Sequence, residues 1–147
     1  MTKLTEIIAA FDGLDHQERL ELLLDFAENL PELPEQYREE RDTGLHRVPE
    51  CMTPTFLWVE RNDGHVQIHA YVAPEAPTVK GFVAILVEAF EGATPDEILA
   101  APADILNQIG LARALGMNRL RGLNAVQHRI RNEVKRVAAV SHTSPTN

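Results

Sequence analysis

The sequence is poor in the residues on which disulfide-bonded, membrane-spanning and nucleic-acid-binding proteins depend. Its 147 residues include one cysteine, Cys51, so no disulfide can form within the chain. No apolar run approaches the roughly 18 residues of a membrane span, and the start, residues 1–6, lacks the basic and apolar segments of a signal peptide. The 14 Lys and Arg against 22 Asp and Glu give a net charge of −8, which disfavours nucleic acid and anionic membranes as partners. We therefore expect a soluble cytoplasmic protein.

Motifs for several other chemistries are also missing. Gly-rich phosphate loops, nucleophile-elbow serines and paired catalytic carboxylates are absent, and serine is scarce throughout. His65 and His69 are four residues apart in a strand pattern, about 13 Å at ~3.3 Å per residue, so they cannot bind one metal ion together. A zinc site of Cys51, His46 and one of these histidines stays open, although zinc motifs normally have closer ligand pairs. We predict that the chain itself holds no metal and no cofactor.

Charge is distributed unevenly along the chain. Residues 1–50 carry most of the excess acid, whereas residues 113–136 contain seven bases and the single acid Glu133. Such a segment could meet an acidic protein surface. It is equally typical of a solvated helix face, so both interpretations stay open.

Apolar periodicity predicts helices on both sides of one hairpin. Residues 4–11 and 15–29 have helical spacing, and Asp15 with Glu18 makes a capping box. Residues 30–35 form a connector, because proline cannot continue the helix. The alternating segments 55–61 and 66–72, joined by Asn62-Asp63-Gly64, predict an antiparallel hairpin with one buried face.

Further helices are expected after the hairpin. The pattern predicts one that ends at Gly92, a short one after Thr94-Pro95-Asp96-Glu97, one from Pro102 to Gly110, and a long one capped by Asn118. Helices that flank a hairpin indicate the α+β class. We predict one domain at residues 1–140 and a disordered tail at residues 141–147.

Cys51 lies in a loop, Val48-Pro49-Glu50-Cys51-Met52-Thr53-Pro54, outside any periodic apolar run. A lone thiol in a loop can be reactive, although free cysteine is also a common buried apolar residue. With no second cysteine, a sulfur species formed here cannot be resolved internally, which favours a thiol that holds a group and passes it on. His46 and Arg47 could stabilise a thiolate if the loop folds back, whereas Glu50 would oppose its ionisation.

A set of short motifs follows one order along nearly the whole chain. They are Asn29-Leu30-Pro31-Glu32-Leu33-Pro34-Glu35-Gln36-Tyr37, then Cys51 and the hairpin, then Thr78-Val79-Lys80-Gly81, Glu91-Gly92-Ala93-Thr94-Pro95-Asp96-Glu97-Ile98-Leu99, Gly110-Leu111 and Asn118-Arg119-Leu120-Arg121-Gly122-Leu123. Together they resemble the SufE family, the sulfur acceptors of iron–sulfur cluster assembly.

The resemblance implies a small α+β fold of SufE/IscU type, with an antiparallel sheet of about three strands packed against helices. It implies that Cys51 is the persulfide-accepting nucleophile. A pyridoxal-phosphate-dependent cysteine desulfurase would donate the sulfur and be stimulated, and an iron–sulfur scaffold complex would receive it. The pyridoxal phosphate would belong to the desulfurase. Arg119, His46, Met52 and Thr53 are the expected supporting residues, with Arg119 at the position of the family's arginine before the last helix.

The sequence departs from the family around the cysteine. Glu50, Met52, Thr53 and Phe56 stand where the family usually has glycine, glutamine, serine and tryptophan, and Trp58 lies two residues later. These departures permit an alternative, a non-catalytic adaptor that binds and regulates a desulfurase without carrying sulfur. A one-cysteine peroxidase is a further alternative, for which no activating group is visible nearby.

We also expect the free protein to shield Cys51, since an exposed persulfide would be lost to cytoplasmic thiols. Met52, Pro54 and Phe56 are the expected apolar cover, and transfer would require the loop to swing out.

Overall fold

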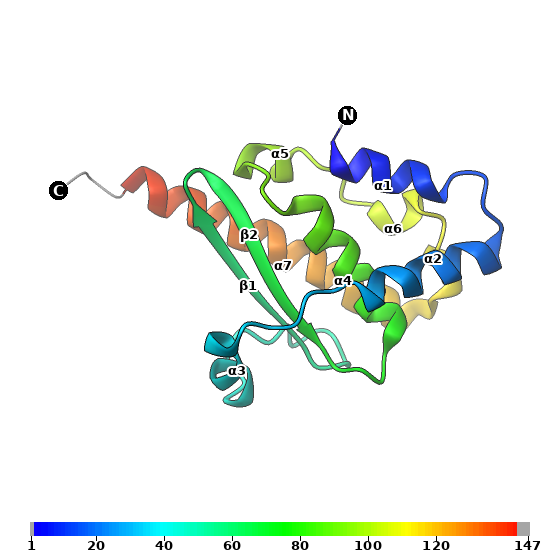
Figure 1. The fold of residues 1–147 in the computed structure, drawn as a ribbon, viewed down its shortest axis with the longest axis horizontal. Coiled ribbons are helices and arrows are strands. Elements are labelled where there is room, and N and C mark those ends of the chain that lie inside the picture. Colours follow the sequence, from blue (N-terminus) through cyan, green and yellow to red (C-terminus); the bar gives the residue numbers. More distant parts are fainter. Residues whose placement is uncertain (1, 144–147) are drawn as a thin grey trace.

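Helices surround one β-hairpin in the structure, a computed structural model that describes residues 2–143, apart from the side chains of 114, 118 and 140–143 (Figure 1). In chain order the elements are α1 (Lys3–Phe11), α2 (His16–Glu28), α3 (Glu35–Asp42), β1 (Thr55–Asn62), β2 (His65–Val72), α4 (Pro77–Phe90), α5 (Pro95–Leu99), α6 (Ile105–Gln108), a 3-10 turn (Ala112–Ala114) and α7 (Gly116–Thr143). The mixed α+β class is confirmed.

The predicted helix starts are formed by reciprocal side-chain caps. The Asp15 carboxylate accepts a hydrogen bond from the Glu18 amide at 2.8 Å, and the Glu18 side chain accepts from the Asp15 amide at 3.0 Å. Thr94 and Glu97 make the same capping box at the start of α5. Each box satisfies two amides that have no partner inside the helix, which fixes where the helix begins.

The hairpin has the predicted two-residue turn. Asn62 pairs with His65, so Asp63 and Gly64 form the loop, with φ values of 55° and 81°. Two successive positive φ angles characterise the type I′ turn, whose twist matches that of the flanking strands. The turn sets the register that places Thr55, the first residue of β1, opposite Val72, the last of β2.

Both faces of the hairpin are covered. Its inner face contributes to the main core, where β2 packs on α4 and β1 on α7. Its outer face holds a separate cluster, which we call the outer aromatic cluster; its members are Leu33, Tyr37, Phe56, Trp58 and the partly buried Tyr71. Leu33 and Tyr37 come from the connector and α3, which therefore cover the face that α4 and α7 do not (Figure 1).

Helix α4 lies at the centre of the fold and packs on α1, α2, β2 and α7. It approaches α2 so closely that a Cβ atom on Gly81 would lie 2.4 Å from the carbonyl oxygen of Leu23. Helix α7 extends behind α4 and the hairpin and packs against β1, α4 and α5 (Figure 1). It thereby presents one side to the loop that precedes β1.

The sheet is smaller than the resemblance implied. Of about three expected strands, the described residues form two, and a third segment contributes one antiparallel bridge, Arg47 to Phe56. Two hydrogen bonds form this bridge, from the Val48 amide to the Thr55 carbonyl at 2.8 Å and from the Leu57 amide to the His46 carbonyl at 3.0 Å. Pro49 directly after this segment lacks the amide hydrogen that a longer ladder requires.

Several helix boundaries also differ from expectation. Helix α3 was not predicted, α6 begins at Ile105 with Asp104 as its N-cap rather than at Pro102, and α7 begins at Gly116, so Asn118 lies inside the helix. Helix α7 is formed as far as Thr143. The rest of the expected tail, residues 144–147, lies outside the described residues, and the division into a domain and a tail stays a prediction.

Candidate functional site

Cys51 lies in a short closed loop between the third sheet segment and β1. The Val48–Thr55 hydrogen bond closes the base of this loop. Inside it, the Cys51 amide donates to the Val48 carbonyl at 3.2 Å, which makes residues 48–51 a β-turn with Pro49 in its second position. Proline favours that position because its φ angle is already fixed near the required value. We call residues 49–54 the Cys51 loop.

The thiol faces inward, against α7. Cys51 has a relative exposure of 4% and belongs to the main core. A Cβ atom on Gly122 of α7 would lie 3.3 Å from the Cys51 Cα and 3.4 Å from its sulfur, closer than most real contacts. The missing side chain of Gly122 therefore provides the space in which Cys51 lies. The expectation that the free protein shields Cys51 is confirmed.

A buried hydroxyl lies next to the sulfur. Thr55 is fully buried, and its Oγ1 lies 3.5 Å from Cys51 Sγ and 3.0 Å from the Thr53 carbonyl oxygen. One hydroxyl proton can be donated to only one of these acceptors. A thiol can itself donate to Oγ1 while the hydroxyl donates to the carbonyl, whereas a thiolate needs the hydroxyl proton. Thr55 can thus serve either protonation state of Cys51 by rotating its hydroxyl.

The Cys51 loop directs other side chains to solvent. Met52 has a relative exposure of 81%, so the expectation that it covers the thiol is wrong. Phe56, another of the three residues expected to cover it, packs in the outer aromatic cluster. Thr53 is partly buried, and its carbonyl, rather than its side chain, is the group that contacts Thr55. The cover of Cys51 comes from α7 and the main core instead.

His46 lies on the outer face of the hairpin, next to the outer aromatic cluster. Its ring stacks on Trp58 with centroids 5.3 Å apart, and its Nε2 lies 3.3 Å from a Glu40 carboxylate oxygen. Its backbone has φ 67°, a left-handed conformation that is uncommon for a residue with a side chain. The imidazole of His46 therefore contacts Trp58 and Glu40.

Two arginines of α7 hydrogen-bond to other segments of the fold. Arg129 donates from Nη1 to the Arg47 carbonyl at 3.3 Å and so holds the segment that leads into the loop. Arg119, which is exposed, donates to the Thr78 hydroxyl in the first turn of α4 at 3.2 Å. Arg119 thus bridges α7 and α4.

The outer aromatic cluster contains one unsatisfied donor. Trp58 is 3% exposed, and its indole Nε1 has no hydrogen-bond partner among the described residues. Tyr37 stacks against it at 5.3 Å and donates its hydroxyl to Glu60. Burial, and then the hydrogen bond to Glu60, raise the pKa of the Tyr37 hydroxyl above its usual value, so it stays protonated well into the alkaline range.

The described part of the chain offers little support for a resident metal. No three His, Cys, Asp or Glu side chains gather there in a group that could hold an ion, and His69 is near Glu60 rather than Cys51. In the same part of the chain, no helix combines the length and apolarity needed to cross a bilayer.

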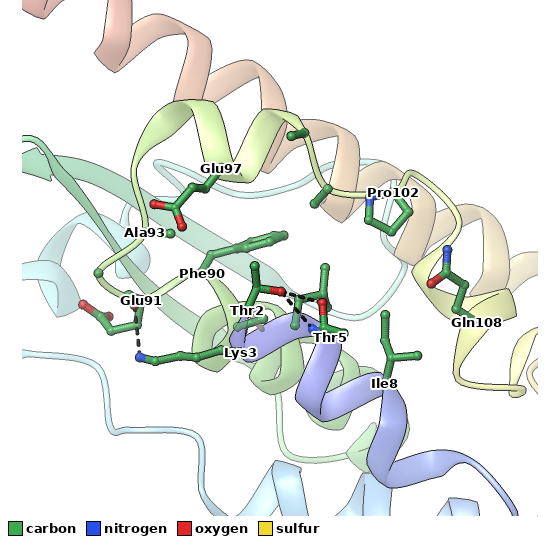
Figure 2. Close-up of a pocket in the computed structure, with 15 residues that line it drawn as sticks. Thr2, Lys3, Thr5, Ile8, Phe90, Glu91, Ala93, Glu97, Pro102 and Gln108 are labelled. Atoms are coloured by element: carbon green, nitrogen blue, oxygen red, sulfur yellow. Dashed lines mark hydrogen bonds between the residues drawn. The ribbon is translucent and has the colours of Figure 1, made fainter.

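A cavity of about 730 Å³ lies elsewhere, between α1, the end of α4, and α5 and α6 (Figure 2). Figure 2 shows Phe90 and Ile8 on its walls and Glu97 and Gln108 at opposite sides. Lys3 at its edge donates to the Glu91 carbonyl at 3.2 Å. None of the described residues that line it belongs to the Cys51 loop, so it is separate from the thiol.

Thr55 and Gly122 were missed by the sequence reasoning. A glycine inside a helical pattern is itself a signal, because it costs about 0.5–1 kcal/mol relative to alanine and often marks a close approach. That signal does not say what approaches. Thr55 carried no signal beyond its β-branched strand preference.

Comparison with known proteins finds one family over nearly the whole chain. The model of the family described as "SufE: Fe-S metabolism associated domain" matches residues 5–134. An uncharacterized SufE-like protein of Mycobacterium tuberculosis is 37% identical over 133 residues, which cover 90% of this chain and 91% of that protein. The sulfur acceptor protein CsdE of Escherichia coli is 26% identical over 82% of this chain and 80% of its own.

A solved structure has the same fold. The solution structure of a hypothetical protein from Thermus thermophilus matches with a TM-score of 0.80 and 33% sequence identity, over 95% of this chain and 99% of that one. The small hairpin packed with helices is therefore shared by a related protein.

Proposed function

The chain belongs to the SufE family, and we propose that it accepts persulfide sulfur from a cysteine desulfurase on Cys51, stimulates that enzyme, and passes the sulfur to an iron–sulfur cluster scaffold. The observation that supports this most is the placement of the single thiol in a short loop, held against Gly122 and Thr55. The sulfur acceptor named among the relatives supports the same role.

The transfer is a thiol–disulfide exchange in which atoms and electrons balance. The Cys51 thiolate attacks the outer sulfur of a persulfide on the desulfurase cysteine. The new sulfur–sulfur bond forms on Cys51, the old one breaks, and the desulfurase cysteine leaves as a thiolate. The proton lost by the Cys51 thiol goes to solvent, and no external oxidant or reductant is needed.

Thr55 supports the reactive form of the thiol. When Cys51 loses its proton, the Thr55 hydroxyl at 3.5 Å can turn from the Thr53 carbonyl and donate to the sulfur. A hydrogen bond to a charged sulfur is stronger than one between neutral groups, so this donor would hold the attacking sulfur in place. Thr55 is a positioning residue in this scheme.

The Cys51 loop has to open for the attack, because the sulfur is 4% exposed. Few contacts oppose this motion. At Cys51 itself, the contacts among the described residues are the turn hydrogen bond to Val48, the Thr55 contact and the packing on Gly122. The exposed side chains of Glu50 and Met52 give a partner surface to hold while the loop moves outward. The closed state protects a loaded persulfide from other thiols.

Mass spectrometry separates carrier from adaptor. The full chain is incubated with the desulfurase of the same organism, its cofactor and free cysteine, and Cys51 is expected to gain one sulfur atom that a reductant removes. Cys51→Ser should gain none and should still bind the desulfurase, but no longer stimulate its turnover. A Cys51→Ser variant that stimulates as well as the natural chain would support the adaptor instead.

A further inference from the structure

A second cavity, of about 360 Å³, lies between the α2–α3 connector, α3, the end of β2 and the start of α4. Three cations line it, Arg38, Arg41 and Lys80, against the single acid Glu32. The remaining lining is apolar apart from Tyr71. Three bases against one acid is the reverse of the balance of the chain, whose net charge is −8.

The cations of this cavity are incompletely neutralised. Among the described residues, no carboxylate oxygen lies within 4.0 Å of Lys80 or Arg38. Arg38 instead donates to the Leu33 carbonyl at 3.2 Å. Arg41 is paired with Asp42 at 3.1 Å, and its guanidinium lies 4.6 Å above the Tyr71 ring. Stacking on a ring limits the motion of a guanidinium and leaves its edge able to donate.

The start of α4 adds to the positive potential. Pro77 is its first residue, and no side chain caps its first turn. The uncapped end of a 14-residue helix carries a partial positive charge, and Lys80 lies within its first turn. The Arg119 guanidinium, bonded to Thr78, adds a further cation there.

The cavity is joined to the Cys51 loop by the backbone. Val72 lines the cavity and pairs with Thr55, and the Ala73 amide donates to the Pro54 carbonyl at 2.9 Å. A partner that brings its own cysteine to Cys51 covers about 800 Å² on this chain in an interface of ordinary size. Because Val72 and Ala73 pair directly with Thr55 and Pro54, we expect a footprint of this size to include the cavity.

We infer that this cationic cavity is a docking site for acidic side chains of the cysteine desulfurase. The inference rests on the proposed function. A protein fits better than a free small anion because Arg38 is exposed at the rim and the lining combines tyrosine and arginine, the residues enriched where interfaces bind most tightly. Asp or Glu side chains fit its charge, and an arginine can bind a carboxylate in bidentate geometry.

Binding can be tested without sulfur transfer. In a Cys51→Ser background, the Kd for the desulfurase of the same organism is measured by titration calorimetry for Lys80→Glu, Arg38→Glu and, as the matched control, Lys135→Glu. Lys135 is an exposed base of α7 with no ion-pair partner among the described residues, so its change alters net charge equally. Each cavity variant should raise Kd roughly fivefold or more and reduce the dependence of Kd on salt, whereas the control should change Kd less than about twofold.

The alternatives give different results. Equal weakening by all three variants, or by none, would overturn the docking site. So would inorganic phosphate that displaces the desulfurase with a Kd below about 1 mM, beyond the effect of sodium chloride at matched ionic strength, because the cavity would then be a small-anion site. If Cys51 of the natural chain gains no sulfur while Lys80→Glu and Arg38→Glu still weaken binding selectively, the proposed transfer fails and the docking site stands.

Discussion

At Cys51, protection and reactivity depend on the same few contacts. The sulfur is buried by α7, which keeps other thiols away, yet its neighbour Thr55 has a hydroxyl that can donate to a thiolate. A wholly apolar pocket would protect the thiol and oppose its ionisation. A single hydroxyl shared with the Thr53 carbonyl allows the site to change state by one bond rotation.

Replacing Thr55 by valine should slow sulfur acceptance. Valine keeps the shape of the side chain but has no proton to donate, so the thiolate loses its hydrogen bond. We expect the initial rate of persulfide formation at saturating desulfurase to fall severalfold, because the attacking sulfur then has no hydroxyl donor beside it. Quenched-flow mass spectrometry measures this rate.

Thr55→Ser is the matched control, since it keeps the hydroxyl and removes only the methyl group. The loss of that buried methyl group should lower the folding stability by about 1 kcal/mol. Its rate of persulfide formation should stay close to that of the natural chain. If valine and serine slow the reaction alike, the effect of Thr55 is packing alone and its proposed role is lost.

Arg119→Ala should weaken desulfurase stimulation severalfold and leave the melting temperature nearly unchanged. Among the described residues its side chain hydrogen-bonds to Thr78 in an exposed position, and exposed contacts contribute little to stability. Arg129 is no control, because it holds the Arg47 carbonyl beside the Cys51 loop. Arg121→Ala, an exposed arginine two residues away, is the better comparison in the turnover assay. Equal losses for both arginines would remove Arg119 from the site.

At the scale of elements, the sequence predicts those helix starts and turns that depend on interactions between residues close together in the chain. The capping boxes at Asp15 and Thr94 and the Asp63-Gly64 turn satisfy or shape nearby backbone groups, so their signals lie within a few residues. Helix α3 has no such signal. Its one buried residue is Tyr37, which gives no apolar period, and its position depends on the outer face of the hairpin.

The candidate site divides in the same way. The uniqueness of Cys51 and its loop are visible in the chain, since they follow from composition and from two prolines. Its neighbours are not, because Gly122 is distant in sequence and reaches it only when α7 packs along β1. The prediction that Met52 covers the thiol failed for a related reason. Met52 is apolar and follows the buried Cys51, but neighbouring side chains in a loop need not point in the same direction.

Gly122→Ala tests the contact between α7 and the Cys51 loop. The new methyl group would lie 3.3–3.4 Å from Cys51 atoms, so the loop has to shift by a few tenths of an ångström. Alanine also favours the helix by about 0.5–1 kcal/mol, which offsets part of the crowding. We expect near-unchanged stability with severalfold faster alkylation of Cys51 by a small reagent in the free protein.

Asn124→Ala provides the control for helix propensity, since Asn124 is an exposed residue of the same helix. It should raise stability slightly and leave the alkylation rate unchanged. An unchanged alkylation rate in Gly122→Ala would mean that α7 does not hold the loop closed.

At the scale of the whole molecule, the rigid and movable parts are separate. Helices α4 and α7 and the hairpin share one continuous core, whereas residues 49–54 lie at its edge between two backbone anchors. Loop opening therefore needs no rearrangement of the core. A partner that binds the surrounding surface can favour the open loop by contacts that the closed loop does not offer.

This separation predicts that the desulfurase gates the thiol. Alkylation of Cys51 should be slow in the free protein, where the sulfur is 4% exposed, and severalfold faster in the complex with a desulfurase whose own active-site cysteine is replaced by serine, so that no sulfur moves. The rate is followed by mass spectrometry on this chain alone. A Gly122→Ala chain, already opened, should gain less from the partner than the natural chain does. Equal rates with and without partner would contradict gating, because a loop that opens by itself gives the bound enzyme no advantage over any other thiol in the cell.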